Sequence, residues 1–224
     1  MTVAASSLDR LRVHRWTGAA GLLFLVLIIP AIVTESLGPE PTMSPAEVTA
    51  KFSSARTDVL ISSVLLVAAV AAFFVFAVGV AETIRNARPA GLLPALSRSS
   101  GAVGVGILAV YTAIFASLAS SIHHVQNVEL VYGIFRAAYA IDSSSDLFLG
   151  LFMAASAVPI ARSGLAGPWL TRFTLFGGTF YALGSLSITS PNSGIFGAFE
   201  ILGALLFMLW VAVTSIRLLR TPSS

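Results

Sequence analysis

Long apolar runs separated by arginine clusters constrain this chain more than any other feature. Of its 224 residues, 56% are hydrophobic and only 10% are charged, and the mean hydropathy is +0.90. A hydrocarbon core about 30 Å thick needs about 20 apolar residues in a helix, and it offers backbone groups no partner outside a helix or a closed barrel. The sequence therefore predicts six membrane-spanning helices, at about 15–37, 57–85, 98–122, 140–161, 168–190 and 194–218.

The basic residues predict how these helices are oriented. Ten of the thirteen Lys and Arg residues fall on one side of such a bundle, which leaves Lys51, Arg56 and Arg136 on the other side. The ten are Arg10, Arg12, Arg15, Arg85, Arg88, Arg98, Arg162, Arg172, Arg217 and Arg220. Because Lys and Arg concentrate in cytoplasmic segments, we expect an all-α, six-helix integral protein of the cell membrane, with both termini in the cytoplasm.

The chain reads as one membrane domain over 1–224, because no stretch outside the spans is long enough for a soluble core. The longest is an extracytoplasmic loop at about 38–56. The segment 123–140 could be an amphipathic helix on the outer interface or an extension of the fourth span. One straight helix from Glu129 to Ala161 would be about 50 Å long, so we expect a break or bend near Asp142.

Composition also excludes several classes of function. Cys is absent, which rules out thiolate nucleophiles, disulfides and Cys-based metal centres. The formal net charge of +3 is explained by arginines that anchor span ends beside anionic lipid. We therefore expect membrane lipids, and no nucleic acid, as partners. The oligomeric state does not follow from the sequence.

Four acidic residues are candidates for catalysis: Asp58, Asp142, Asp146 and Glu200. The topology places them, together with His124, in one layer in the outer half of the bundle. Ionisable residues within spans are costly and by default indicate function. Asp142 and Asp146 are four residues apart and share a helix face. Two carboxyl groups this close would not both ionise easily, so one of them should keep its proton. A general acid needs such a transferable proton. Alternatively, each carboxylate pairs with an arginine or a helix N-terminus and only stabilises the bundle.

Aromatic and polar side chains near this layer are candidates for substrate binding. They are Phe148, Phe152, Phe199, Tyr139, Tyr111, His124 and Arg136. They could line a pocket for an apolar ligand or stabilise a cation, or they could serve only in packing and lipid contact. Adjacent His123 and His124 point about 100° apart on a helix, so we predict no metal site and no cofactor.

Two stretches carry a resemblance to a known family. The stretch 146–186 reads DLFLGLFMAASAVPIARSGLAGPWLTRFTLFGGTFYALGSL, with Arg-Ser-Gly, a proline and a glycine-rich span that ends in Tyr-x-x-Gly. Together with RWTGAAGLLFLVLIIP near the N-terminus, it resembles a bacterial multi-pass membrane family defined only as a domain of unknown function. The resemblance implies six helices and a cytoplasmic N-terminus, and it implies no activity.

Three classes of function remain open at this point. The first is an intramembrane enzyme that uses acid–base chemistry on a hydrophobic, lipid-like small molecule, in the manner of a terpene cyclase acting on polyprenyl-type substrates. The second is a structural or regulatory membrane subunit without catalysis. The third is a proton-coupled transporter, which is disfavoured because the polar layer does not continue to the cytoplasmic side.

Overall fold

The computed structural model describes residues 2–87, 91–125, 127–162, 167–188 and 194–220. Arg88, one of the ten basic residues used to predict the topology, lies outside these ranges. The end of the predicted fifth span, at 189–190, does so as well.

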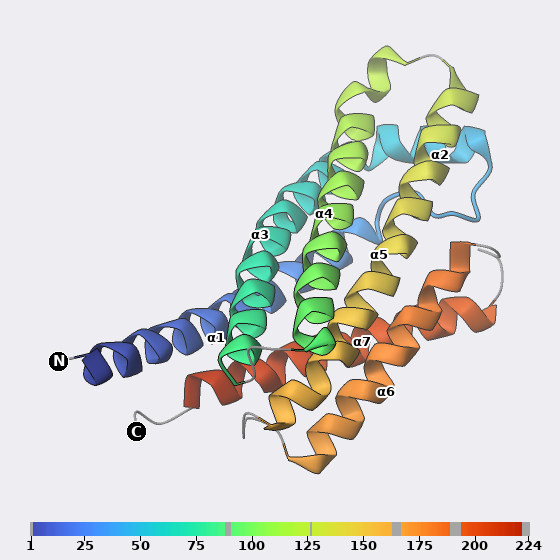
Figure 1. Ribbon diagram of the computed structural model, residues 1–224. Helices are drawn as coiled ribbons and strands as arrows, with labels where there is room; N and C mark the ends of the chain where they lie inside the picture. The colour runs from blue at the N-terminus through green and yellow to red at the C-terminus, as the bar shows by residue number, and fades with distance from the viewer. Residues whose placement is uncertain (1, 88–90, 126, 163–166, 189–193, 221–224) are drawn as a thin grey trace.

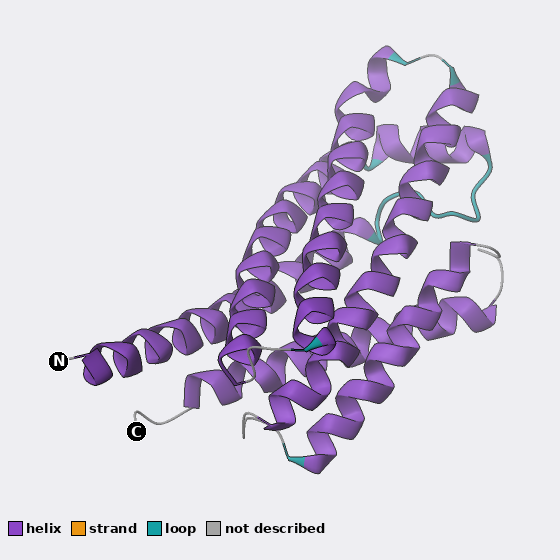
Figure 2. Ribbon diagram, in the orientation of Figure 1, coloured by secondary structure: helices purple, strands orange, loops and turns teal. Residues whose placement is uncertain are grey.

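Every regular element within the described ranges is a helix (Figure 2). The elements are α1 (Thr2–Glu35), α2 (Pro45–Ser54), α3 (Arg56–Ala87), α4 (Leu92–Ser121), the 3-10 turn η1 (Ile122–His124), α5 (Val128–Arg162), α6 (Pro168–Gly184), the 3-10 turn η2 (Ser185–Ile188) and α7 (Gly194–Arg220). The prediction of an all-helical chain is therefore confirmed.

Five helices in the described part of the chain are long and apolar enough to cross a membrane. Their qualifying segments are Arg12–Glu35, Arg56–Arg85, Leu92–His124, Val128–Arg162 and Ile195–Arg220. The remaining predicted span, the fifth at 168–190, corresponds to α6, which has only 17 residues and passes directly into η2. The 3-10 turn ends the α-helix early, so α6 is shorter than its neighbours.

The six long helices form a closed ring in which each packs against the next along the chain. The order of contacts is α1, α3, α4, α5, α6, α7, and α7 then packs against α1. Figure 1 shows α3, α4 and α5 side by side, while α1 and α7 cross them obliquely and bring the two ends of the chain to the same side of the molecule. A ring of this kind encloses a central space to which every long helix can contribute side chains.

One local expectation, a break in the helix near Asp142, is wrong. The helix α5 runs without interruption from Val128 to Arg162, so the break expected near Asp142 does not occur. No proline or glycine lies between Gly133 and Gly150, so nothing in that stretch interrupts the helical hydrogen bonds.

The loop expected at 38–56 contains a short helix, α2. Ser44 and Glu47 form a capping box at its start, in which the Ser44 backbone N–H donates to Glu47 Oε2 at 2.8 Å. Two buried side chains, Val48 and Phe52, fix the helix on the bundle. Phe52 packs against Phe115 of α4 and Phe135 of α5, with ring centroids 5.5 and 5.8 Å apart. The helix therefore covers one end of the ring.

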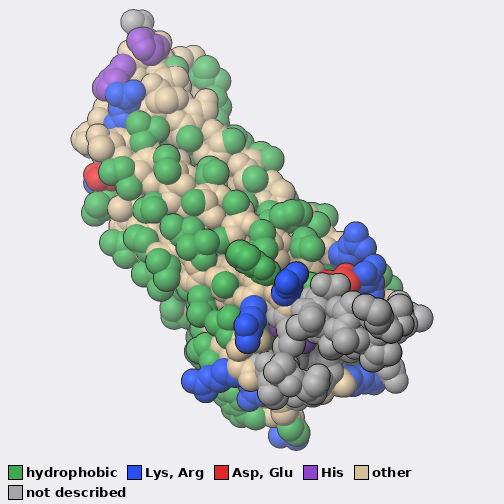
Figure 3. All heavy atoms as spheres, turned by 90° about the vertical axis from the view of Figure 1, so that its left-hand side faces the viewer, with side chains coloured by type: hydrophobic (Ala, Val, Ile, Leu, Met, Phe, Trp, Pro, Cys, Tyr) green, Lys and Arg blue, Asp and Glu red, His purple; other side chains and the backbone are tan. Residues whose placement is uncertain are grey.

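The surface shown in Figure 3 has a wide band of hydrophobic side chains across its middle. Most Lys and Arg side chains in this view gather at one end, and a group of His side chains marks the opposite tip. An apolar belt between polar ends is the surface expected of a bundle that sits in a bilayer.

Candidate functional site

A cavity of about 220 Å³ lies within the ring and is lined by residues of all six long helices. Its walls are mainly aliphatic and aromatic. Its polar lining consists of Glu35, Tyr111, Asp142, Asp146, Tyr181 and Glu200. We call this space the acidic cavity. An apolar pocket with a few converging polar groups is the usual form of a small-molecule site.

Four carboxyl groups converge on the acidic cavity from three helices. Glu35 ends α1, Asp142 and Asp146 lie one turn apart on α5, and Glu200 lies near the start of α7. Asp142 lies within electrostatic range of both Glu35 and Glu200. No Lys, Arg or His is found among the described residues that line the cavity. Like charges at short range in a low dielectric oppose one another's ionisation, and no basic side chain in this lining offsets the four carboxyl groups.

Asp146 is a buried acid in the wall of the cavity. Its side chain is only 6% exposed, and the Tyr181 hydroxyl of α6 donates a hydrogen bond to its carboxyl. The second oxygen, Oδ2, is buried and has no hydrogen-bond partner among the residues that the structure describes. Buried polar atoms are nearly always paired, so an unpaired carboxyl oxygen at a cavity wall is the atom best placed to contact a molecule bound in the cavity.

Glu35 has a single dedicated partner. The Tyr111 hydroxyl of α4 donates a hydrogen bond to Glu35 Oε1 of α1. Tyr111 is 2% exposed, and its ring packs on Phe115 and Tyr139 with centroids 4.9 and 6.5 Å away. Because the tyrosine is held by aromatic packing, it also fixes where the Glu35 carboxyl lies.

Glu200 is joined to α5 through serine hydroxyls. Ser187 Oγ of η2 lies 3.1 Å from Ser143 Oγ of α5, and it is also within hydrogen-bond reach of the Glu200 carboxyl. Ser143 lies between the two aspartates in sequence, so this link places the α7 acid beside the α5 pair.

Glycines allow the helices that carry these groups to approach closely. A Cβ at Gly203 of α7 would lie 2.6 Å from Tyr181 Cα, and a Cβ at Gly184 of α6 would lie 2.9 Å from Glu200 Cα. Between α5 and α6, a Cβ at Gly150 would lie 2.5 Å from the carbonyl oxygen of Gly178. Backbone atoms cannot move aside as a flexible side chain can, so these glycines set the positions of Tyr181 and Glu200.

An aromatic floor closes the acidic cavity on the side away from the carboxyls. It consists of Phe24, Phe73 and Phe207, whose ring centroids lie 5.0, 5.4 and 6.4 Å apart. Below it, Trp210 packs edge-on against Phe76 and Phe152 at 5.8 and 5.5 Å. The floor separates the acids from the arginine-rich end of the bundle.

Three of the four predicted acids line this cavity, and Asp58 does not. Asp58 lies in the first turn of α3, and Leu66 is the first residue of that helix to reach the cavity. Eight residues of α-helix span about 12 Å, which places Asp58 beyond the cavity along α3.

Of the residues predicted to bind substrate, only Tyr111 lines the cavity. His124 is exposed in η1, and Arg136 donates a hydrogen bond to the Pro41 carbonyl at 3.0 Å. Both therefore lie at the end of the bundle that α2 covers, away from the acids.

The remaining aromatic candidates pack around the cavity without lining it. Tyr139 lies behind Tyr111, and Phe152 is buried in the core against Phe73 at 5.9 Å. Phe199 contacts Phe180 at 5.3 Å, and Phe148 is half-buried.

Sequence reasoning missed Glu35 and Tyr181. Glu35 is an acid in the last turn of the first span, at the same predicted depth as the other acids, so its position alone could have indicated it. Tyr181 carries no such signal, because one tyrosine in a glycine-rich span has many possible orientations.

Comparison with protein-family models, with curated proteins and with solved structures found no match for this chain. The resemblance drawn from 146–186 therefore stays a prediction. In the described part of the chain, no three His, Cys, Asp or Glu side chains are arranged so that they could hold a metal ion.

Proposed function

We propose that this chain is a multi-pass protein of the cell membrane with six spans, in which α6 and η2 together form the fifth. Helix α6 alone reaches about 26 Å at 1.5 Å per residue, and η2 extends it. The basic residues favour cytoplasmic termini, which puts the acidic cavity in the outer half of the bilayer.

We propose further that the acidic cavity is the active site of an enzyme that acts on a hydrophobic, lipid-like small molecule. The observation that carries this proposal is the unpartnered Oδ2 of Asp146 in a cavity lined by all six long helices. A buried acid without a cationic partner, facing an apolar space, is suited to deliver a proton to a substrate that enters from the membrane.

The reaction class is an acid–base isomerisation or cyclisation, as in a terpene cyclase. Asp146 transfers a proton to a carbon–carbon double bond, which leaves a carboxylate on the protein and a carbocation on the substrate. Tyr111 and Phe207 line the cavity, and their aromatic rings can stabilise the cation. A carboxylate of the same cavity, such as Glu200, then removes a proton, so the substrate changes its bonding without any co-reactant.

The experiment that tests this proposal follows protons onto carbon. The purified protein in lipid vesicles is incubated in D₂O with linear polyprenols of several chain lengths, and deuterium in the recovered lipid is measured by mass spectrometry. We expect deuterium on carbon with the protein and none with empty vesicles. A protein without catalysis, such as a structural or regulatory subunit, would give no incorporation with any polyprenol.

A second candidate, proton-coupled transport, is favoured by one specific observation. Below the aromatic floor, three buried polar atoms have no hydrogen-bond partner within the described ranges: Trp210 Nε1, Thr214 Oγ1 and Ser215 Oγ. Glu200, Phe207 and Thr214 follow one another at intervals of seven residues, so they share one face of α7. A pH-sensitive dye inside the vesicles tests this candidate. If the protein is a transporter, the dye should report proton entry, and Thr214→Val should slow that entry. If the protein is an enzyme, the dye should report no proton entry.

A further inference from the structure

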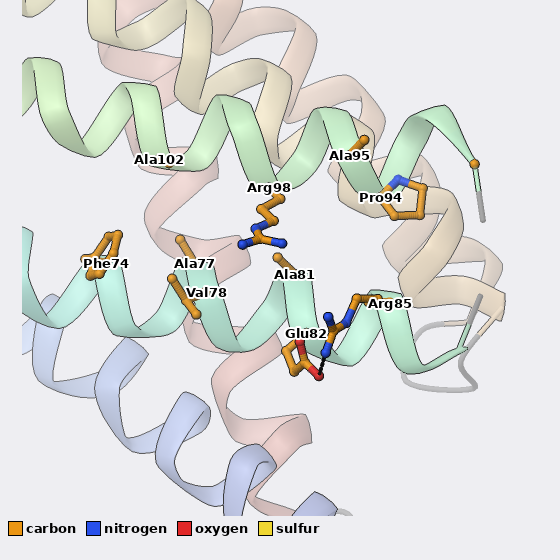
Figure 4. A pocket seen from close by; sticks show the side chains of 11 residues that line it. Phe74, Ala77, Val78, Ala81, Glu82, Arg85, Pro94, Ala95, Arg98 and Ala102 are labelled. Atoms are coloured by element: carbon orange, nitrogen blue, oxygen red, sulfur yellow. Dashed lines mark hydrogen bonds and ion pairs between the residues drawn. The ribbon is translucent and has the colours of Figure 1, made fainter. Parts of the chain in front are cut away.

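A second hollow lies between α3 and α4, at the end of the bundle opposite η1. This α3–α4 groove has a volume of about 450 Å³. Its apolar walls are Phe74, Ala77, Val78 and Ala81 on α3, and Ala95 and Ala102 on α4. Figure 4 shows Phe74, Ala77 and Ala81 on the side of α3 that faces α4. The small alanines on both sides keep the groove open.

The groove carries its basic groups at one end. The Arg98 side chain extends from α4 across the groove toward α3, and Arg85 lies at the end of α3 (Figure 4). Arg85 pairs with Glu82 at 2.6 Å. Arg98 is exposed, and it makes no hydrogen bond or ion pair with any described residue. An unpaired guanidinium above an apolar groove lacks the anion that it is suited to bind.

The apolar part of the groove extends away from these arginines toward the middle of the bundle. Phe74 and Val78 are 47% and 50% exposed, so this wall faces the surroundings of the protein. Phe74 and Arg85 are eleven residues apart on α3, which corresponds to about 16 Å along the helix. A basic mouth followed by an apolar channel matches a molecule with an anionic head and a hydrocarbon tail.

We propose that the α3–α4 groove binds one anionic phospholipid, with its phosphate on Arg98 and one acyl chain between Ala81 and Ala102. Basic pockets between membrane helices near the cytoplasmic face recognise anionic head groups in this way. The lipid would hold together the ends of α3 and α4. This site is separate from the acidic cavity. The proposal does not depend on the proposed enzyme activity and rests only on the placement of the bundle in a membrane.

The test measures phospholipid binding by native mass spectrometry of the full chain in detergent, with phosphatidylglycerol as the probe. We expect one phosphatidylglycerol per protein in preference to phosphatidylcholine. Arg98→Gln should weaken phosphatidylglycerol binding about fivefold, the effect of one arginine near an anionic lipid. Arg172→Gln is the control, because it changes an exposed arginine outside the groove. This variant should bind phosphatidylglycerol as tightly as the unmodified protein does.

A second pair of variants tests the acyl-chain channel independently of charge. Ala102→Leu fills the groove, whereas Ala109→Leu adds the same bulk to an exposed position of α4 outside it. Only Ala102→Leu should reduce phosphatidylglycerol binding, with unchanged unfolding temperature in the absence of lipid.

Two results would overturn the proposal. Equal phosphatidylglycerol binding by Arg98→Gln and the unmodified protein would show that Arg98 does not hold the head group. Full displacement of the lipid by millimolar glycerol 3-phosphate would show a site for a free anion instead of a lipid.

Discussion

The hydroxyl of Tyr111 on α4 donates its hydrogen bond to the Glu35 carboxyl on α1, across the interior of the ring. These helices are not neighbours in the ring, because α3 lies between them. The bond therefore crosses the acidic cavity, and it stabilises both the bundle and the position of one acid.

Tyr111→Phe removes this bond and leaves the aromatic packing intact. Because Glu35 then lacks its hydrogen-bond donor, we expect a loss of about 1 kcal/mol in the free energy of unfolding. Tyr132→Phe is the matched control, since Tyr132 packs partly buried on the core and its hydroxyl makes no hydrogen bond with any described residue. Thermal unfolding in detergent measures both variants, and equal stability of the two would contradict the structural role of the bond.

Gly203→Ala places a methyl group 2.6 Å from the Tyr181 Cα, so α6 and α7 must separate. We expect a loss of about 1–3 kcal/mol in stability, and a change in the acidic cavity that Tyr181 and Glu200 line. Gly197→Ala on the same helix meets nothing within 4 Å, and its higher helix propensity should leave stability equal or slightly increased. Equal unfolding temperatures for the two variants would contradict the close contact between α6 and α7 at Gly203.

The topology can be measured cleanly because the chain has no Cys. In intact cells, a membrane-impermeant maleimide should label Thr42→Cys in the outer loop and leave Arg220→Cys unlabelled until the membrane is opened. Both positions are exposed. Labelling of Arg220→Cys in intact cells would contradict the cytoplasmic C-terminus.

The capping box of α2 should make this outer helix sensitive to acid. Hydrogen bonds from Ser44 lower the pKa of the Glu47 carboxyl from its ordinary value of 4.5. A lowered folded-state pKa gives stability that is present above pH 4.5 and is lost as the pH falls through the folded-state value. The protection factors of the amides in 45–54, which are corrected for the intrinsic pH dependence of exchange, should therefore fall in acid, and Glu47→Ala should remove this fall. A pH dependence that persists in Glu47→Ala would show that another group is responsible.

Much of the architecture could be predicted because hydrocarbon permits few alternatives. Apolar runs of twenty residues must be helical there. Counting residues from the end of each run was enough to assign Asp146 and Glu200 a common depth. The sequence does not reveal the rotation of each helix about its axis, which decides whether a side chain faces the ring or the lipid. Tyr181 was missed for this reason.

The outer segments were harder to predict because local and tertiary effects compete there. The helix α2 is short, and it is fixed by the burial of Val48 and Phe52, which no local pattern specifies. The second span was predicted to begin at 57 and α3 begins at Arg56, but a place at the end of a span does not reveal whether a side chain reaches a cavity deeper in the bundle, and Asp58 does not line it. Arg136 was assigned to the pocket, yet its contact is with a loop carbonyl.

The most direct test of the account compares Asp146→Asn with Asp58→Asn in the deuterium-incorporation assay. Asn keeps the shape of the side chain and its contact with Tyr181 but has no proton to transfer, so Asp146→Asn should lower incorporation at least about 100-fold and unfold at nearly the same temperature. Asp58→Asn makes the same chemical change outside the cavity and should retain full incorporation. Undiminished incorporation by Asp146→Asn would contradict the account.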